Sequence, residues 1–345
     1  MKILKLTSVI ALAFIFSINS LFAVGENLDA SSKGEAIKVA TAGGQFLKIP
    51  IGARAVGMGG AGGSIVNDLS AIYWNPAGIA DIKGVSAEFS YLQWFASYSH
   101  SFAAASLPIG NDFAIAAHAI SFSSGNIQQT TVANPEGLSA DYQVADISAG
   151  LTFSGYLTDQ FSFGITAKYI NNSIYNVSSN GFAFDVGTLY NTGIYGIKIA
   201  FSMHNLGTET AYEGQSLRTA KKPIEAADAA PVDMTMIAYP YSYPLVFRAG
   251  ISSDVYKEDD HAVLVAADFT TFSDVSEQFS FGAEYKWSNL VALRAGYQFN
   301  QDEFGFAGGI GINYELGEVQ GKFDYSINPT KTLGLVNRFT IGVAF

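Results

Sequence analysis

Seven charged residues in the second half of the chain stand in stretches where apolar and polar side chains alternate. Each of the seven occupies the polar set of positions, two residues away from Gly, Thr, Gln or another charged residue in that set. They are Arg248, Asp268, Glu284, Lys286, Arg294, Lys322 and Asp324. Alternate residues of a strand point to opposite faces, so the seven predict one polar face carrying both signs of charge. Such a face supports ion pairing between strands; a ring that selects a charged substrate is the alternative, which the pattern leaves open.

Other residues whose side chains could bind a metal or catalyse a reaction do not have the spacing that such a site needs. The four histidines stand on different predicted strands without metal-ligand spacing, and we expect them to be hydrogen-bonding residues of a lumen. They are His100, His118, His204 and His261. The acidic turn at 258–260 lacks the glycine and the terminal glutamate of a calcium loop, no serine stands in a nucleophile elbow, and there is no cysteine. We therefore expect no enzyme, no cofactor and no metal site.

The charged residues are positioned by alternating stretches that run through most of the chain. About fourteen stretches alternate, each about 9–12 residues long, which is enough for a tilted strand to cross a bilayer. They are 85–95, 98–107, 113–123, 142–153, 161–170, 181–190, 197–205, 245–253, 261–270, 277–287, 290–300, 304–314, 319–328 and 338–345. A cation facing lipid at mid-membrane costs ~2–4 kcal/mol. The charged set is therefore predicted to line a lumen, with the aromatic set facing lipid.

The composition points to the same class. Hydrophobic residues make up 49% of the 345 residues and charged residues only 14%, below the ~25% of soluble domains. Beyond the N-terminus no apolar run reaches the ~18 residues of a helical span. A chain that is apolar overall but polar at every second position is typical of a transmembrane β-barrel. The net charge of −11 argues against nucleic acid as a partner.

The connections between the stretches fall into two classes that alternate along the chain. Six short ones are predicted at 108–112, 157–160, 191–196, 256–260, 288–289 and 317–318, and longer ones at 124–141, 207–244 and 329–337. Short turns on one side and long loops on the other are typical of outer-membrane barrels. One short connection on the long-loop side, at Ala96-Ser97, is the only irregularity expected. The predicted fold class is an all-β, antiparallel outer-membrane barrel of about fourteen strands.

The two ends of the chain are expected to carry signals for export and for assembly into the outer membrane. Residues 339–345 alternate up to the terminus, with Phe339, Ile341, Val343 and Phe345 on one face. A terminal aromatic on a lipid-facing edge is typical of bacterial outer-membrane barrels, so we interpret these four as an assembly signal for the barrel assembly machinery of a Gram-negative cell. At the other end, Lys2 and Lys5 precede an apolar stretch at 9–18. We expect a signal peptide at 1–23, cleaved after Ala23; a retained helical anchor is the alternative.

Residues 24–80 do not alternate and are rich in Gly and Ala. Gly57, Gly59 and Gly62 formally match a dinucleotide fingerprint, but the strand, helix and acidic residue which that motif needs are missing. We instead expect tight bends and close backbone packing, with Asn67-Asp68 capping a helical turn at 69–74 and Asn75-Pro76 ending it. The segment is predicted to be a plug or hatch in or beneath the barrel, which takes up 81–345.

A resemblance supports this interpretation. The residues that carry it are Gly52, Arg54, Gly57, Gly59, Gly60, Asn67, Asp68, Trp74, Asn75, Pro76 and Gly78. The stretch 52–80, above all its Tyr-Trp-Asn-Pro-Ala-Gly end, is similar to the N-terminal signature of the PorV/PorQ family of outer-membrane proteins, which are related to FadL-type barrels. The resemblance implies a barrel in the outer membrane. In some members it also implies a role in type IX secretion, in which the barrel receives cargo from the translocon.

Two functional hypotheses follow. In the first, the barrel binds a protein partner of type IX secretion, either secreted cargo or a secretion-system subunit. The contact surface would be the loop at 207–244, with Tyr212, Arg218, Tyr239, Tyr241 and Tyr243, because tyrosines give rigid amphipathic contact area; an ordinary lid is the alternative for this loop. In the second, the barrel carries a hydrophobic small molecule past the hatch. A purely structural barrel, with outer-membrane lipid as its partner, is the third possibility.

Overall fold

The computed structural model describes residues 42–221 and 230–345 of this chain. The expected signal peptide at 1–23, its cleavage site after Ala23 and residues 24–41 of the predicted hatch lie outside the described residues.

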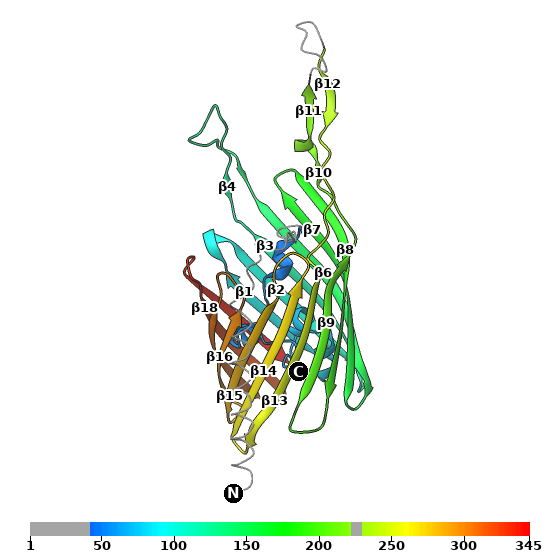
Figure 1. Ribbon diagram of the computed structural model, residues 1–345, viewed down its shortest axis with the longest axis vertical. Helices are drawn as coiled ribbons and strands as arrows, with labels where there is room; N and C mark the ends of the chain where they lie inside the picture. The colour runs from blue at the N-terminus through cyan, green and yellow to red at the C-terminus, as the bar shows by residue number, and fades with distance from the viewer. Residues whose placement is uncertain (1–41, 222–229) are drawn as a thin grey trace, which may run out of the picture. The chain divides into compact units, whose positions relative to one another are not determined.

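Fourteen long strands in the described part of the chain form an antiparallel sheet that closes into a barrel (Figure 1). Each long strand pairs with the next one along the chain, and β19 pairs with β1 to close the barrel, from Ser86–Ala344 to Gln93–Asn337. The strands are β1 (Ser86–Gln93), β2 (Ser99–Ile109), β3 (Phe113–Ser123), β6 (Val144–Thr158), β7 (Phe161–Ile174), β8 (Val177–Asn191), β9 (Lys198–Gly207), β13 (Val246–Glu258), β14 (His261–Phe272), β15 (Gln278–Trp287), β16 (Val291–Phe299), β17 (Phe306–Leu316), β18 (Val319–Pro329) and β19 (Leu335–Ala344). The predicted fold class is confirmed.

The long loops hold shorter elements. They are β4 (Ile127–Gln128), β5 (Asp141–Tyr142), β10 (Glu213–Gly214), β11 (Arg218–Lys221), β12 (Val232–Thr235) and the 3₁₀ turn η6 (Gln215–Leu217). The short connection between β1 and β2 holds another 3₁₀ turn, η5 (Phe95–Ser97). Strand β10 adds to the edge of β8, and β11 pairs with β12 in a separate hairpin beyond the barrel strands (Figure 1).

Side chains alternate between the two faces of the barrel wall as the sequence predicts. Along β3 and β7, more exposed residues, most of them apolar, alternate with buried ones, most of them small or polar. On β19 the side chains of Phe339 and Ile341 face outward, and Phe345, just past the strand, is 65% exposed. The buried positions face the lumen, so the packed core of this protein lies inside the barrel.

Two expectations about the connections are corrected. The sequence predicts a longer connection at 329–337, but β18 and β19 are joined by only five residues, 330–334. The sequence also predicts a two-residue connection on the long-loop side only at Ala96-Ser97, but β7 and β8 are joined there by two residues, Tyr175 and Asn176. These two strands continue beyond the predicted ends at residues 170 and 181 because the polar residues there still pair across the ladder, for example Asn172 with Ser179. These strand ends were not predicted because their residues are mostly polar, so apolar and polar side chains do not alternate there.

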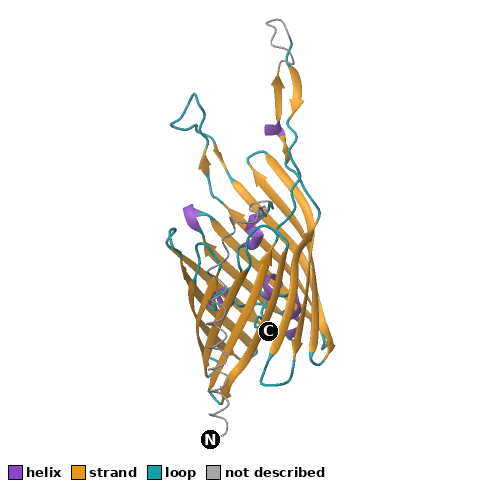
Figure 2. Cartoon of the chain, viewed as in Figure 1, coloured by secondary structure: helices purple, strands orange, loops and turns teal. Residues whose placement is uncertain are grey.

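Residues 42–84, which we call the inner segment, lie within the barrel (Figure 2). Its elements are η3 (Gln45–Lys48), α2 (Ala53–Gly57), α3 (Ala71–Trp74) and η4 (Pro76–Asp81). Helix α2 packs against β16, β17, β18 and β19, whereas η4 packs against β3, β6, β7 and β8. Apolar residues such as Ile51, Met58 and Leu69 are buried against the inner wall. In the described residues, no helix has the length and apolar character needed to span a membrane.

Candidate functional site

The structure places the seven charged residues predicted to line the lumen on the inner side of the wall. Arg248, Asp268, Glu284, Arg294 and Asp324 are buried, and Lys286 and Lys322 are partly buried. Glu284 is completely buried, which a carboxylate tolerates only with charged or hydrogen-bonding partners.

Those partners come from both the wall and the inner segment. The guanidinium of Arg54 on α2 donates two hydrogen bonds of 2.9 Å to the two carboxylate oxygens of Glu284. Arg294 donates to the same carboxylate at 2.6 Å and to Asp324 at 2.6 Å. Paired in this fork geometry, Arg and carboxylate form one of the stronger polar contacts in proteins. The network therefore attaches α2 to β15, β16 and β18.

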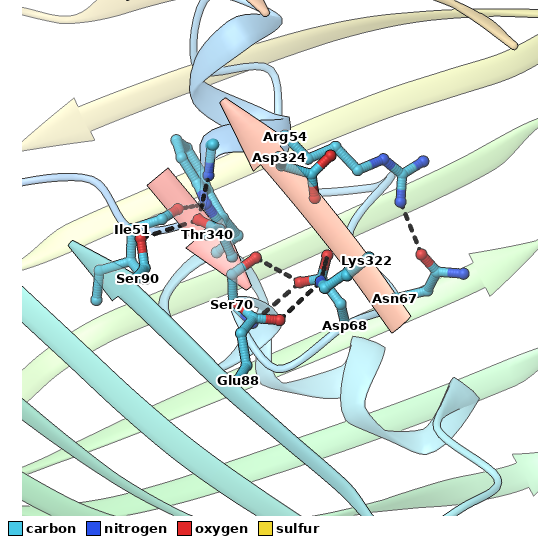
Figure 3. A network of polar contacts seen from close by, with 12 residues as sticks. Ile51, Arg54, Asn67, Asp68, Ser70, Glu88, Ser90, Lys322, Asp324 and Thr340 are labelled. Atoms are coloured by element: carbon cyan, nitrogen blue, oxygen red, sulfur yellow. Dashed lines mark hydrogen bonds and ion pairs between the residues drawn. The ribbon is translucent and has the colours of Figure 1, made fainter. Parts of the chain in front are cut away.

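A second ionic contact attaches the following loop of the inner segment (Figure 3). The ammonium of Lys322 on β18 lies 2.6 Å from Asp68 and 2.7 Å from Glu88 on β1. Asp68 also accepts hydrogen bonds from the backbone and hydroxyl of Ser70. Burial alone would raise the pKa of the Asp68 carboxyl, but Lys322 and Ser70 favour its charged form and lower the pKa to about 2.

The predicted role of Asp68 as a helix cap is therefore corrected. Helix α3 begins at Ala71 with Ser70 as its N-cap residue, and no side chain caps it. The carboxylate of Asp68 is instead held by Lys322 and Ser70, and Asn67 accepts a hydrogen bond from Arg54. Asn75 does end α3, and its side chain accepts from the backbone of Ala77 at the start of η4.

The other residues of the predicted hatch motif form the bends that bring the inner segment against the wall. These are Gly52, Gly57, Gly59, Gly60, Trp74, Pro76 and Gly78. Gly59 has a φ of +68°, and a Cβ there would lie 2.4 Å from the backbone nitrogen of Tyr297 on β16. Trp74 donates its indole N–H to the carbonyl of Ile51 at 2.7 Å, across the inside of the segment.

A third polar cluster, which was not predicted as a site, lies on the opposite wall. Lys168 is 2.8 Å from Asp185 and donates to Asn205 at 2.6 Å. The register between β8 and β9 shifts at Asp185, so His204 and Asn205 both face inward. Alternation alone assigns two consecutive residues to opposite faces, so only a bulge could have revealed this cluster. His204 and Ser202 both contact the carbonyl of Trp74, which ties α3 to β9.

The predicted partner surface divides into two parts. Tyr239 is 91% exposed, and Arg218 is exposed on β11. Tyr243 is only 3% exposed, and Tyr241 lies between it and Tyr212, with its hydroxyl bonded to Ser179. Tyr243 is therefore buried and Tyr241 partly buried, both packed against the inner segment and not on an exposed contact surface, which corrects the prediction for Tyr241 and Tyr243. They pack against the inner segment because Gly43 and Gly44 leave room for their rings.

Two cavities lie on either side of the inner segment. The loop-side cavity, near the long loops, has a volume of about 280 Å³ and largely apolar walls that include Val56, Trp74, Trp94, Phe272 and Phe304. The turn-side cavity, near the short turns, has a volume of about 700 Å³.

The two cavities differ in charge. The turn-side cavity is lined by both signs, among them Arg54, Asp68, Glu88 and Lys322. The loop-side cavity is lined by Lys48, Arg248 and Arg338, and by no Asp or Glu among the described residues. Neither Glu88 nor Arg338 was predicted as a lumen residue, although Arg338 alternates with the outward-facing Phe339 and Ile341. That alternation was the signal that could have found it.

Comparison with known proteins identifies the fold. The amino-acid sequence matches no protein-family model and no curated protein. The structure is similar to the toluene transporter TbuX of Ralstonia pickettii (12% identity, 85% of this chain and 97% of that chain, TM-score 0.51). It is also similar to the toluene transporter TodX of Pseudomonas putida (13%, 85% and 96%, 0.54) and to the monoaromatic hydrocarbon channel CymD (13%, 86% and 98%, 0.57). The chain therefore shares the barrel fold of these three structures. At these identities the likeness concerns the fold alone.

Proposed function

We propose that this chain is an outer-membrane channel for small hydrophobic molecules. The observation that carries the proposal is the loop-side cavity, where aromatic residues of the loops and of the inner segment enclose about 280 Å³. Ligand sites are typically concave and largely apolar, with few polar groups. The names of three proteins with a similar fold are those of toluene transporters and a hydrocarbon channel, which supports the same class of ligand.

The inner segment separates this cavity from the turn-side cavity. Val56 and Gly59 line the first, whereas Arg54 and Asp68 line the second. A molecule that entered from the loop side would meet this segment, so passage through the barrel requires the segment to shift. The ion pairs of Arg54 and Asp68 hold the closed arrangement.

A substitution at the rim tests the proposal without disturbing the core. Val275 lines the loop-side cavity from a loop and is partly exposed, so Val275→Trp is expected to fill the entrance and to weaken toluene binding at least tenfold. Val255→Trp, on the outer face of β13, is the matched control and is expected to bind like the wild type. Binding is measured by calorimetry on the protein in lipid nanodiscs. Equal toluene affinity in both variants, or none in the wild type, contradicts the proposal.

A protein partner, as in the PorV/PorQ hypothesis, is the second candidate, and one observation favours it. The hairpin β11–β12 and the residues after it expose Val232, Met234, Met236, Ile237 and Tyr239. Contiguous exposed apolar residues often mark a contact surface. Deleting residues 215–239 leaves Thr210 paired with Tyr241 and is expected to abolish co-purification of a secreted protein or secretion subunit, observed by native mass spectrometry. Co-purification of the partner that is unchanged by the deletion contradicts this candidate function. A wild-type protein that co-purifies with no other protein also contradicts it.

Location in the outer membrane and removal of residues 1–23 belong to the same proposal. The exposed apolar band of the barrel supports a lipid surround. The protein is purified from the separated outer membrane, and its mass is expected to be that of a chain that begins after Ala23. A mature chain that retains Met1 contradicts the cleavage.

A further inference from the structure

Arg338 is a buried cation without a compensating charge. Its residue is 2% exposed, on the inner face of β19. In the described part of the chain it takes part in no ion pair, and its Nη1 has no hydrogen-bond partner. A buried charge that is neither paired nor fully hydrogen-bonded is unfavourable by several kcal/mol, and Arg does not lose its proton. Such a group is unusual in a structure whose other buried Arg side chains contact carboxylates or carbonyl oxygens.

The surroundings of Arg338 do not supply a negative charge. The loop-side cavity is lined by two other cations, Lys48 and Arg248. Lys48 is neutralised by Asp274 at 2.9 Å. Arg248 donates to the carbonyl of Tyr73 at 2.8 Å, and its guanidinium lies over the rings of Tyr73 and Trp74. The cavity is therefore apolar in its walls and positive in charge.

A polar group beside Arg338 also lacks a partner. Asn328 lines the same cavity, and its Oδ1 has no hydrogen-bond partner among the described residues. On the β18–β19 ladder, Ser326 lies opposite Arg338 and Asn328 lies opposite Val336, so Asn328 and Arg338 are diagonal neighbours on the inner face. The side-chain amide can present its NH₂ instead of its oxygen by rotation, and so can donate to an anion that Arg338 holds.

We propose that the loop-side cavity binds a small organic anion, with its carboxylate or sulfonate on Arg338 and its apolar body against the aromatic wall. This inference rests on the proposed channel function and specifies its ligand as an acid rather than a bare hydrocarbon. A volume of about 280 Å³ is at the lower end for ligand sites, which suits a body of about one ring. Trp74 and Trp94 border that space and report on its occupancy.

The test compares three probes of similar shape: benzoate, toluene and benzylamine. Each is titrated into the full-length protein in nanodiscs, by calorimetry and by tryptophan fluorescence. Benzoate is expected to bind at least tenfold more tightly than benzylamine. In Arg338→Gln, benzoate affinity is expected to fall at least tenfold while toluene affinity stays within twofold. Arg218→Gln, on the exposed hairpin, removes one positive charge away from the cavity and is expected to change neither affinity.

A second variant distinguishes a loss of anion binding from a loss of folding. Asn328→Asp places a carboxylate of the same shape beside Arg338, which is expected to stabilise the fold and to abolish benzoate binding. Toluene binding with no preference for benzoate over benzylamine, or benzoate binding that survives both substitutions, overturns the anion inference and leaves the channel proposal standing. No binding of toluene or benzoate by the wild type overturns both.

Discussion

The buried carboxylate of Glu284 joins the inner segment to the barrel wall, because Arg54 and Arg294 both donate hydrogen bonds to it. Its place in the same alternate set of positions as Ser280 and Gly282 predicted an inward-facing carboxylate, and the structure places it on the inner side of the wall. Its partner Arg54 could not be predicted, because it is 230 residues away in the chain. Its partner Arg294 stands directly opposite on β16, and that pairing depends on the exact register of the β15–β16 hairpin. The pairing of charges inside a barrel depends on the path of the inner segment and on strand register. Neither of these can be determined from the local alternation of residues.

The pKa of Asp68 gives a prediction about pH. Because the folded pKa of about 2 lies below the ordinary value of 3.8, the carboxylate stabilises the folded chain above pH 3.8, and this contribution is lost as the pH falls through 2. Asp68→Asn is therefore expected to lower the free energy of unfolding by about 2 kcal/mol at pH 7 and by much less at pH 2. Denaturant unfolding followed by tryptophan fluorescence measures both. Asp233→Asn, on the exposed hairpin, is the control; an equal loss for Asp68→Asn at the two pH values contradicts the ion pair.

At the scale of elements, the inner segment was the hardest part to predict. Its lack of alternation and its glycines predicted a compact unit in or beneath the barrel, and the turn ending at Trp74 was placed correctly. The second turn, η4, was not predicted, because Asn75-Pro76 was interpreted only as a stop. Pro at the first position of a helical turn also starts one, and the Asn75 side chain caps it.

Gly59 tests how closely this segment packs on the wall. Gly59→Ala places a side chain in a left-handed conformation and against the backbone of Tyr297. Gly110→Ala is the matched control, because Gly110 has a φ of +63° with no atom within 4 Å of an added Cβ. The control is expected to lower the free energy of unfolding by ~1–2 kcal/mol, and Gly59→Ala by at least ~1 kcal/mol more. The same loss in both variants contradicts the close approach of Gly59, in the bend that follows α2, to β16.

At the scale of the whole molecule, each of the fourteen predicted stretches contains or overlaps one long strand of the barrel. Prediction succeeded here because the lipid on one side and the lumen on the other impose the same alternation on every strand. It failed where that constraint ends, as in the polar extensions of β7 and β8. The packing of Tyr241 and Tyr243 against the inner segment could not be predicted either, because a loop sequence does not show whether the loop folds back into the barrel mouth.

The assembly signal remains a prediction for the whole barrel. Phe345 is 65% exposed beside the closing strand pair, and its backbone N–H donates to Val85 at 2.9 Å. Phe345→Ala is expected to reduce the amount of folded barrel in the outer membrane several-fold, measured by heat-modifiable gel mobility. Phe306→Ala removes a similarly exposed ring from β17 and is expected to assemble normally. Equal assembly of the two variants contradicts a special role for the terminal residue.

The entry of a small hydrophobe into cells tests the central claim most directly. The protein, its Val275→Trp variant and an empty vector are compared in one Gram-negative host, by the initial rate at which labelled toluene enters. The account predicts faster entry with the wild type than with the empty vector, and the loss of that increase in Val275→Trp at equal amounts of folded barrel. An entry rate that is the same with and without the wild-type protein would contradict it.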